Sequence, residues 1–288
     1  MSELNNFVPP DFCSKWNSLQ KKKLKFNDFY YDRFSRSGAV TFINGHYHNL
    51  YEVYFLVKGN CRSFIDGRFF DMQEGDIALI PKEVPHKVIY SGEPTDRHLI
   101  NFSDRYIDAV FRNKLKPLFE GGFYRPKKEH IPVINNLFER FAKEWKNNDE
   151  FSELTFKNFA TELFLLMLRN PSEATPATEI DLPIEKTTQY IITNYKEDLT
   201  LNQMAKMAAL SPSYYSRRFK SLTGFGFKEY LTIIRVKEAQ DRLIHSDKSI
   251  VKIAYECGFN DSNYFSTVFK EVNGIPPLKY RKIHRVKL

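Results

Sequence analysis

Short apolar runs separated by tight turns dominate residues 40–102. Residues 53–57 and 77–80 are rich in aliphatic and aromatic side chains of strong β propensity. Asp66-Gly67 lies between two further runs of this kind, and this dipeptide is typical of a two-residue hairpin turn. Pro81 directly follows the run at 77–80 and ends it, since proline cannot donate a ladder hydrogen bond. Several short strands at this spacing predict a small β-barrel or sandwich.

From about residue 103 the apolar period lengthens to that of a helix. Apolar side chains recur three or four residues apart in two stretches, Ile134, Leu137, Phe138, Phe141 and Trp145, then Phe156, Phe159, Ala160, Leu163 and Met167. Two amphipathic helices here either cover the barrel or pair with a second copy of the chain, and one helix can do both. We therefore expect residues 103–170 to form a helical annex that mediates dimerisation.

Residues 171–183 are rich in Pro, Ser and Thr, which predicts a linker. The 288 residues thus divide into a β-rich domain over 1–102, the annex, the linker and a helical domain over 184–288. The β-rich domain begins with a segment that carries Lys21-Lys22-Lys23 and Tyr30-Tyr31. This segment is either a mobile arm that takes part in switching or a solvated leader.

Two segments of the C-terminal domain repeat one pattern. Residues 201–224 and 250–274 each contain an apolar helix with a small alanine, a short turn, and a polar helix that ends in Phe-Lys followed by glycine. This is the layout of a helix-turn-helix motif, whose second helix reads DNA. A helix predicted over residues 227–244 is about 27 Å long. It can hold two recognition helices about 34 Å apart, one turn of DNA, so that one chain covers two successive major grooves.

Helical spacing sorts the side chains of the two polar helices into a core face and an outer face. Tyr215, Phe219, Phe265 and Phe269 fall on the core face. The predicted DNA-binding residues are Ser213, Ser216, Arg217, Lys220, Ser262, Asn263, Ser266, Thr267 and Lys270. An arginine such as Arg217 suits guanine, an asparagine such as Asn263 suits adenine, and Lys220 suits a phosphate. The alternative for each is an ordinary solvated helix face.

The charge distribution supports a polyanionic partner. Residues 181–288 contain 18 Lys and Arg against 11 Asp and Glu, whereas residues 1–180 contain 25 against 24. Nearly all of the net charge of +8 is therefore C-terminal, as double-stranded DNA binding requires, although such a charge also serves solubility. Three cysteines without paired spacing, no signal peptide and no long apolar run predict a reduced, cytoplasmic protein that does not enter a membrane.

The last hundred residues or so closely resemble the AraC/XylS family of bacterial transcription regulators. The matching residues of the second repeat are Ile253-Ala254, Gly258-Phe259, Tyr264-Phe265-Ser266, Phe269-Lys270, Gly274, Pro276 and Tyr280-Arg281. Those of the first are Ser211-Pro212, Ser216-Arg217, Phe219-Lys220, Gly224, Phe227, Tyr230-Leu231 and Arg235. Thr267 stands where members commonly carry arginine, which predicts that the second helix contacts mostly the DNA backbone.

His46, His48, Glu52 and His86 form a second candidate site. In an extended strand, positions 46, 48 and 52 point to one face, and His86 returns after Gly75 and Pro81. The spacing resembles the two cupin motifs, with Glu83 in place of a usual glycine, and AraC-like regulators often carry a cupin-like sensor domain.

Three imidazoles and a carboxylate suit Zn, Fe or Mn. They equally suit a polar pocket that hydrogen-bonds sugar hydroxyls, with Tyr54 as a wall, or a buried His–Glu network without a ligand. We expect the pocket, with His46, His48, Glu52, Tyr54 and His86 binding the ligand and no bound cofactor.

These patterns predict a multidomain α+β protein with an N-terminal cupin-like β-barrel, a helical annex and a C-terminal all-α double helix-turn-helix domain. We expect a homodimeric, ligand-responsive transcription regulator of carbohydrate-related genes. It would bind a sugar or a related metabolite as its effector, and promoter DNA. No arrangement of a hydrolytic triad or phosphate-binding loop points to an enzyme. The alternatives are a metal-dependent cupin enzyme tethered to DNA and a constitutive dimeric regulator without a ligand.

Overall fold

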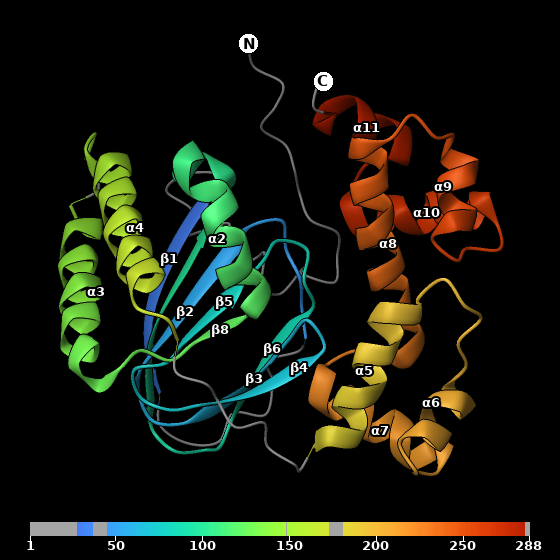
Figure 1. The fold of residues 1–288 in the computed structure, drawn as a ribbon, viewed down its shortest axis with the longest axis horizontal. Helices are drawn as coiled ribbons and strands as arrows, with labels where there is room; N and C mark the ends of the chain where they lie inside the picture. Colours follow the sequence, from blue (N-terminus) through green and yellow to red (C-terminus); the bar gives the residue numbers. More distant parts are fainter. Residues whose placement is uncertain (1–27, 37–44, 148, 173–180, 286–288) are drawn as a thin grey trace. The chain divides into compact units, whose positions relative to one another are not determined.

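The computed structural model describes residues 28–36, 45–147, 149–172 and 181–285. They fall mainly into two compact units, one containing strand β1 and residues 47–172, the other containing residues 181–285. Figure 1 labels their helices and strands. Lys21-Lys22-Lys23 lie outside the described residues.

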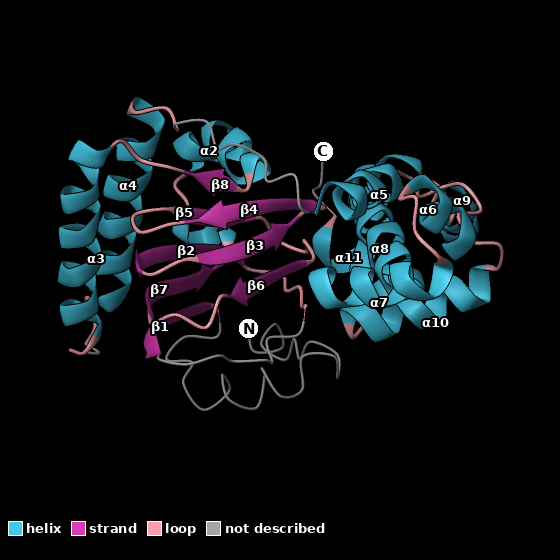
Figure 2. Cartoon of the chain, turned by 90° about the horizontal axis from the view of Figure 1, so that it is seen from below, coloured by secondary structure: helices cyan, strands magenta, loops and turns pink. Residues whose placement is uncertain are grey.

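The N-terminal unit contains two β-sheets. The larger sheet has the strand order β1-β7-β2-β5-β8 and the smaller one β4-β3-β6, as the magenta strands of Figure 2 show. The strands are β1 (Phe29–Arg36), β2 (Tyr51–Lys58), β3 (Cys61–Ile65), β4 (Arg68–Met72), β5 (Ile77–Ile80), β6 (His86–Tyr90), β7 (Thr95–Phe102) and β8 (Phe123–Tyr124). All pairings are antiparallel.

The predicted hairpin is present between β3 and β4. Asp66 and Gly67 have φ values of 48° and 76°, the two positive angles that a type I′ turn requires. Phe64 pairs with Phe69 and Ile65 with Arg68 across this turn. The strand predicted over residues 77–80 is also confirmed.

Two features of the unit differ from the sequence prediction. Tyr30 and Tyr31 belong to β1, which pairs with β7 over its full length, so they are sheet residues and neither arm nor leader. Strand β8 lies inside the segment predicted to be wholly helical and pairs with Ile77 and Ala78.

Alternation along β2 divides the core into two layers. Val53 and Phe55 belong to a cluster shared with the helices, whereas Tyr54 and Leu56 belong to a cluster between the sheets. This is the period-2 pattern of a strand buried on both faces.

Helices α2 (Ala109–Gly121), α3 (Ile131–Trp145) and α4 (Ser152–Arg169) follow the first seven strands. In Figure 1, α3 and α4 run side by side along one face of the larger sheet. The ring of Phe138 stacks on that of Phe55 with 4.6 Å between centroids, and Phe159 packs edge-on against Phe138. The two predicted amphipathic helices therefore cover the sheet.

The C-terminal unit is entirely helical within its described residues. Its helices are α5 (Leu182–Asn194), α6 (Leu201–Met207), α7 (Pro212–Thr223), α8 (Phe227–His245), α9 (Ile250–Glu256), α10 (Ser262–Asn273) and α11 (Pro277–His284). Helix α8 lies between the α6–α7 pair and the α9–α10 pair, as Figure 1 shows. Residues 173–180 of the predicted linker lie outside the described residues, and its last two residues already belong to α5. Pro183 occupies the first turn of that helix, where its missing N–H costs nothing.

Candidate functional site

The first helix-turn-helix motif consists of α6 and α7. Ser211 caps α7 through its side chain, which accepts a hydrogen bond from the Tyr214 amide, and Pro212 begins the helix. Tyr215 and Phe219 are buried as predicted. The helix ends at Gly224, whose φ of 87° is the left-handed conformation of a helix C-cap. The predicted DNA-binding residues of this helix, Ser213, Ser216, Arg217 and Lys220, are all exposed.

Arg217 and Arg218 differ although they are adjacent. The Arg218 Nη2 donates to the buried carboxylate of Asp181 at 2.7 Å, which holds it against α5. Arg217 is exposed and makes no hydrogen bond or ion pair with any described residue. Its five donors are therefore available to a base edge or a phosphate.

The second motif consists of α9 and α10. Asp261 caps α10 by accepting from the amides of Asn263 and Tyr264, and the inward Phe265 and Phe269 are fully buried. Of the predicted DNA-binding residues, Asn263, Thr267 and Lys270 are exposed, and Ser262 and Ser266 are half-buried.

Two hydroxyls of α10 are already engaged within the helix. The Ser266 Oγ donates to the Ser262 carbonyl at 2.9 Å, and the Thr267 Oγ1 donates to the Asn263 carbonyl at 3.1 Å. Each of these hydroxyls can therefore only accept a further hydrogen bond, so Ser266 and Thr267 provide no side-chain donor for DNA, unlike Arg217 of α7.

The sequence prediction missed a pair of tyrosines on the same helices. Tyr214 is 47 % exposed and Tyr264 is 57 % exposed, and each stands three residues after the N-cap of its helix. Aligning the two repeats at their Phe-Lys pairs would have found them, because the tyrosines are then equivalent. Their rings and hydroxyls suit contact with thymine methyl groups or phosphates.

Three residues of the second candidate site, His48, Glu52 and His86, lie in the N-terminal unit. His46, His48, Glu52 and His86 each offer a ligand atom, and these atoms lie within 4.8 Å of one another. The His48 Nε2 is 3.2 Å and the His86 Nε2 is 3.8 Å from the Glu52 Oε2. His48, Glu52 and His86 are buried.

The backbone fixes the orientation of two of these imidazoles. The His48 Nδ1 lies 2.9 Å from the Leu50 carbonyl, and the His86 Nδ1 lies 2.8 Å from the Val84 carbonyl. Both Nδ1 atoms must carry the proton to donate there, so both Nε2 atoms face Glu52. A neutral Nε2 and a carboxylate are both acceptors, so a shared hydrogen-bond donor, a proton or a cation is needed between them to make the approach favourable.

Asn101 completes this cluster and was not predicted. Its Nδ2 donates to the Glu52 Oε2 at 2.8 Å and lies 3.3 Å from the His48 Nε2. It reaches the site because β7 pairs with β2 and places Asn101 opposite Glu52. No sequence motif could have found it, since it is 49 residues away from Glu52.

The predicted strand through positions 46, 48 and 52 is wrong. Strand β2 begins at Tyr51, and His48 precedes it in a turn. The Glu83 amide donates to the His48 carbonyl at 2.7 Å, which holds this turn beside the segment leading to His86. Glu83 has a φ of 60°, the left-handed region that favours the glycine usual at this position of the motif.

Tyr54 lies on the same face of β2 as Glu52 and is fully buried. Its hydroxyl contacts the Tyr90 hydroxyl at 3.3 Å and the Cys61 thiol at 3.8 Å, and the Arg97 guanidinium lies over its ring at 5.6 Å. Burial raises the pKa of the Cys61 thiol to about 12, so this thiol is not a nucleophile. Tyr54 thus packs in the core between the sheets.

Comparisons with known proteins match both units. A family model described as an AraC-like ligand binding domain matches residues 33–159, and one described as a helix-turn-helix domain matches residues 204–283. The transcriptional activators RhaR of Salmonella dublin and of Salmonella typhimurium are 25 % identical to the chain over 246 residues, which cover 83 % of this chain and 86 % of each relative. These relatives are activators of transcription, which confirms the expectation of a regulator rather than an enzyme.

Solved structures are similar to parts or most of the chain. The C-terminal domain of AraT, a response regulator from Geobacillus stearothermophilus, is 32 % identical over 38 % of this chain and 92 % of that one, with a TM-score of 0.37. ToxT from Vibrio cholerae is 19 % identical over 89 % of this chain and 99 % of that one, also with a TM-score of 0.37.

No helix among the described residues combines the length and the apolar character needed to cross a membrane. The two matched models follow one another in the order of a sensor and a DNA-binding domain, and they agree with the β-rich and helical units of the structure. The chain belongs to the AraC family of ligand-responsive, DNA-binding transcription regulators.

Proposed function

We propose that this regulator controls carbohydrate-related genes and binds a sugar or a related polyhydroxylated metabolite in its N-terminal unit. The observation that carries the proposal is the buried group of His48, Glu52, His86 and Asn101, whose donors and acceptors converge. Sugar hydroxyls both donate and accept, so they can satisfy a carboxylate and imidazole nitrogens together. The relatives named RhaR, 25 % identical, are transcriptional activators, which supports a role in gene control.

The ligand would act through a difference in affinity. A sugar that binds one arrangement of the sensor and DNA-binding units more tightly than another shifts the population toward the first. We propose His46, His48, Glu52 and His86 as its hydrogen-bonding partners. Tyr54 would form the wall at the inner end of the site, since it follows Glu52 on the same strand face.

The same residues also suit a metal ion, which is the second candidate. Two imidazoles oriented by Nδ1–H bonds to carbonyls, with their Nε2 atoms toward a carboxylate, are the usual donor set of Zn²⁺ or Fe²⁺. His46, His48, Glu52 and His86 would hold the ion. A bound metal would then supply a Lewis-acidic centre for an oxygen atom of the effector.

Metal analysis of the purified protein together with a thermal-shift screen of sugars and sugar phosphates tests both candidates. A sugar that raises the melting temperature of metal-free protein supports the proposed effector, because a ligand selective for the native state stabilises it. Stoichiometric metal that resists dialysis and is lost in His48→Ala supports the metal. An unchanged melting temperature across the panel, without metal, would leave a constitutive regulator.

The DNA-binding residues are proposed in two classes. Arg217, with Ser213 and Ser216, would contact base edges, and Lys220 and Lys270 would contact phosphates. Ser262, Asn263, Ser266 and Thr267 would form the weaker second contact. We add Tyr214 and Tyr264 because both are exposed on the recognition helices. Such a regulator acts where promoter DNA is, which we propose is the cytoplasm.

The annex is proposed to form the homodimer contact. The inner faces of α3 and α4 are used by the sheet, but Val133, Phe151 and Leu154 remain exposed. Single exposed apolar residues are common, so the contact would combine several of them. Analytical ultracentrifugation of wild type and of Leu154→Glu tests this: the variant should be more monomeric at the same concentration.

A further inference from the structure

Helix α8 carries three charged residues on the side that contacts the end of α5 and the second helix-turn-helix motif. Arg235, Glu238 and Arg242 are spaced three and four residues apart, which places them along one side of the helix. None of them belongs to the apolar clusters, and none lies on the recognition helices α7 or α10. Their partners come from the end of α5 and from α9.

Arg235 joins the end of α5 to the turn of the second motif. Its Nε donates to the Tyr195 carbonyl and its Nη2 to the Glu197 carbonyl, each at 2.8 Å. Its guanidinium lies 5.9 Å from the centroid of the Phe259 ring, in the α9–α10 turn. One side chain therefore contacts both the end of α5 and the second motif.

The backbones at the end of α5 and in the second motif approach closely at the same place. Gly258 has a φ of 84°, and a Cβ added there would lie 2.8 Å from the Tyr195 carbonyl oxygen and 3.0 Å from the Arg235 Nε. Only glycine leaves room for this contact. The end of α5 and the second motif thus meet directly as well as through α8. Helix α5 is in turn joined to α7 by the buried hydrogen bond from the Tyr215 hydroxyl to Thr187, at 3.0 Å.

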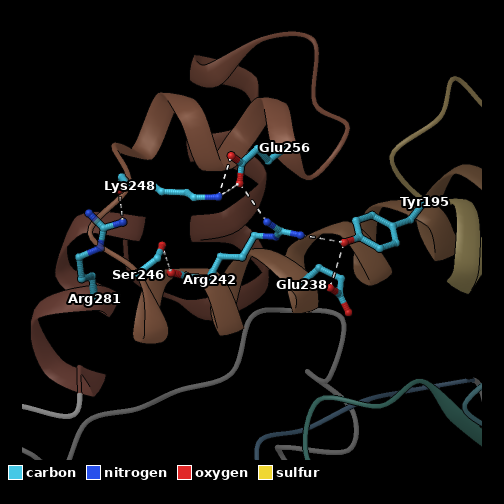
Figure 3. Close-up of polar contacts among 7 residues, drawn as sticks. All are labelled: Tyr195, Glu238, Arg242, Ser246, Lys248, Glu256 and Arg281. Atoms are coloured by element: carbon cyan, nitrogen blue, oxygen red, sulfur yellow. Dashed lines mark hydrogen bonds and ion pairs between the residues drawn. The ribbon is translucent and has the colours of Figure 1, made fainter. Parts of the chain in front are cut away.

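Arg242 makes a second bridge two turns further along α8, as Figure 3 shows. Its Nη1 donates to the Glu256 Oε2 of α9 at 2.9 Å, and its Nη2 lies 3.4 Å from the Tyr195 hydroxyl. That hydroxyl donates to Glu238 at 3.0 Å, and Lys248 holds both oxygens of Glu256 at 2.7 and 2.8 Å.

These contacts form one connected network. An isolated exposed ion pair contributes little, but Arg242 and Glu256 are only about a quarter exposed, and the pair shares partners with Tyr195 and Lys248. Lys248 and Arg242 together hold the pKa of Glu256 below its ordinary value, first through the Lys248 hydrogen bond. Both neighbours therefore favour the charged form of this carboxylate.

A network that holds the two motifs at one distance would restrict the spacing of the DNA half-sites that both recognition helices can reach. Successive half-sites on one face of the duplex are about 34 Å apart, and one extra base pair displaces the second by about 3.4 Å and rotates it by roughly 35°. Two recognition helices held at one separation can both bind the displaced half-sites only if hydrogen bonds of the network between them break. A flexible pair would tolerate it.

We propose that Arg242, through Glu256 and Tyr195, is a positioning residue that fixes the separation of the two recognition helices, so that the protein selects operators by the spacing between their half-sites. This inference rests on DNA binding alone and is independent of the identity of the effector.

The test uses the full-length protein and a DNA fragment selected with wild type from a random-sequence pool. Dissociation constants are measured by fluorescence anisotropy on this fragment and on versions with one or two base pairs inserted between the half-sites. Wild type should lose about tenfold or more in affinity for each insertion, which is the loss of one good base contact. Arg242→Gln, Glu256→Gln and Tyr195→Phe should lose no more than about threefold, since their recognition helices can adjust.

The set of variants separates positioning from charge and from folding. Arg242→Gln removes a positive charge and Glu256→Gln a negative one, so electrostatic attraction to DNA predicts opposite changes in affinity, whereas positioning predicts the same weaker dependence on spacing in both. Tyr195→Phe keeps the buried ring and changes no charge. If Arg242→Gln has a lower melting temperature than wild type, the dependence of affinity on spacing in Tyr195→Phe is the result that tests the proposal. Arg285→Gln, which breaks the exposed pair of Arg285 with Asp247 in the same unit, is the control and should keep the wild-type dependence.

Two results would overturn the proposal. One is a wild-type dependence on spacing in Glu256→Gln and Tyr195→Phe. The other is a uniform weakening of binding at every spacing, which would mean that the network supports only the fold.

Discussion

Arg217 is the side chain on which base recognition is expected to depend most. It is exposed on α7 without a partner among the described residues, whereas neighbouring Arg218 is held by Asp181. We predict that Arg217→Ala relaxes specificity at one base position and costs about 1–3 kcal/mol of binding free energy at the preferred base. Binding measured on operators with each base varied in turn checks this.

Lys220→Ala is the matched control, since Lys220 is exposed one turn further along the same helix. It should weaken binding to all operators about equally and lower the slope of log K against log salt concentration by about 1. Equal weakening of every operator by Arg217→Ala would instead identify Arg217 as a phosphate contact.

His98 makes the stability of the N-terminal unit depend on pH. Burial, with a smaller contribution from the positive charge of Arg33, lowers the pKa of His98 to about 4. The ring is neutral in the folded protein, with the Tyr31 hydroxyl 2.8 Å from its Nδ1 and Phe55 stacked beside it. Since the unfolded chain binds a proton near pH 6.5, stability is full above that pH and falls as the pH decreases toward 4, by up to about 3 kcal/mol.

Urea unfolding of wild type and of His98→Gln at several pH values between 7.5 and 5 measures this contribution. The variant is less stable at pH 7.5 but should lose less stability than wild type on acidification. His245→Gln removes an exposed histidine of α8 and should keep the wild-type pH dependence. The same slope in wild type and in His98→Gln would contradict the assignment.

At the scale of elements, the turn between α9 and α10 depends on Gly258. Alanine there would need a positive φ and would bring its Cβ to 2.8 Å from the Tyr195 carbonyl oxygen. We predict that Gly258→Ala destabilises the helical unit by about 1–3 kcal/mol, the usual cost of a strained backbone position. Gly226→Ala is the control within the same unit, because Gly226 has a φ of −70° and its added Cβ meets nothing closer than 3.9 Å. Thermal melts of both variants distinguish a specific clash from a general loss of glycine.

The elements also show what a single sequence can predict. The helices of the C-terminal unit were predictable because their apolar residues keep one period and the pattern occurs twice. Strand β1 was not, because the inward positions of its sheet carry polar residues, such as Asp32, which pairs with Arg97 of β7. Strand β8 is only two residues long and carries no pattern of its own.

The candidate site in the N-terminal unit was predictable only in part. His48, Glu52 and His86 follow a local motif, and the structure brings them together. The turn that carries His48 and the amide of Asn101 depend on hydrogen bonds between segments distant in the sequence. Such contacts leave no trace in local patterning, so the expected strand through His48 was wrong while the convergence of the side chains was right.

At the scale of the whole molecule, a ligand-responsive regulator couples two binding reactions. An effector changes DNA affinity only if it binds one arrangement of the molecule more tightly, and the coupling free energy is then the same in both directions. If the sugar found in the thermal-shift screen strengthens operator binding by some factor, saturating operator DNA must strengthen sugar binding by that factor. Factors of about 5–150 are typical of such coupling.

Calorimetric titration of the sugar into free protein and into the protein–operator complex measures this factor, and anisotropy with and without sugar should give the same factor. In Arg217→Ala, at operator concentrations too low for the variant to bind, the affinity for sugar should equal that of free wild type. If neither the affinity for DNA nor the affinity for the sugar changes when the other ligand is bound, the two reactions are not linked at equilibrium. The sugar would then control the rate of a step in transcription rather than the occupancy of the operator.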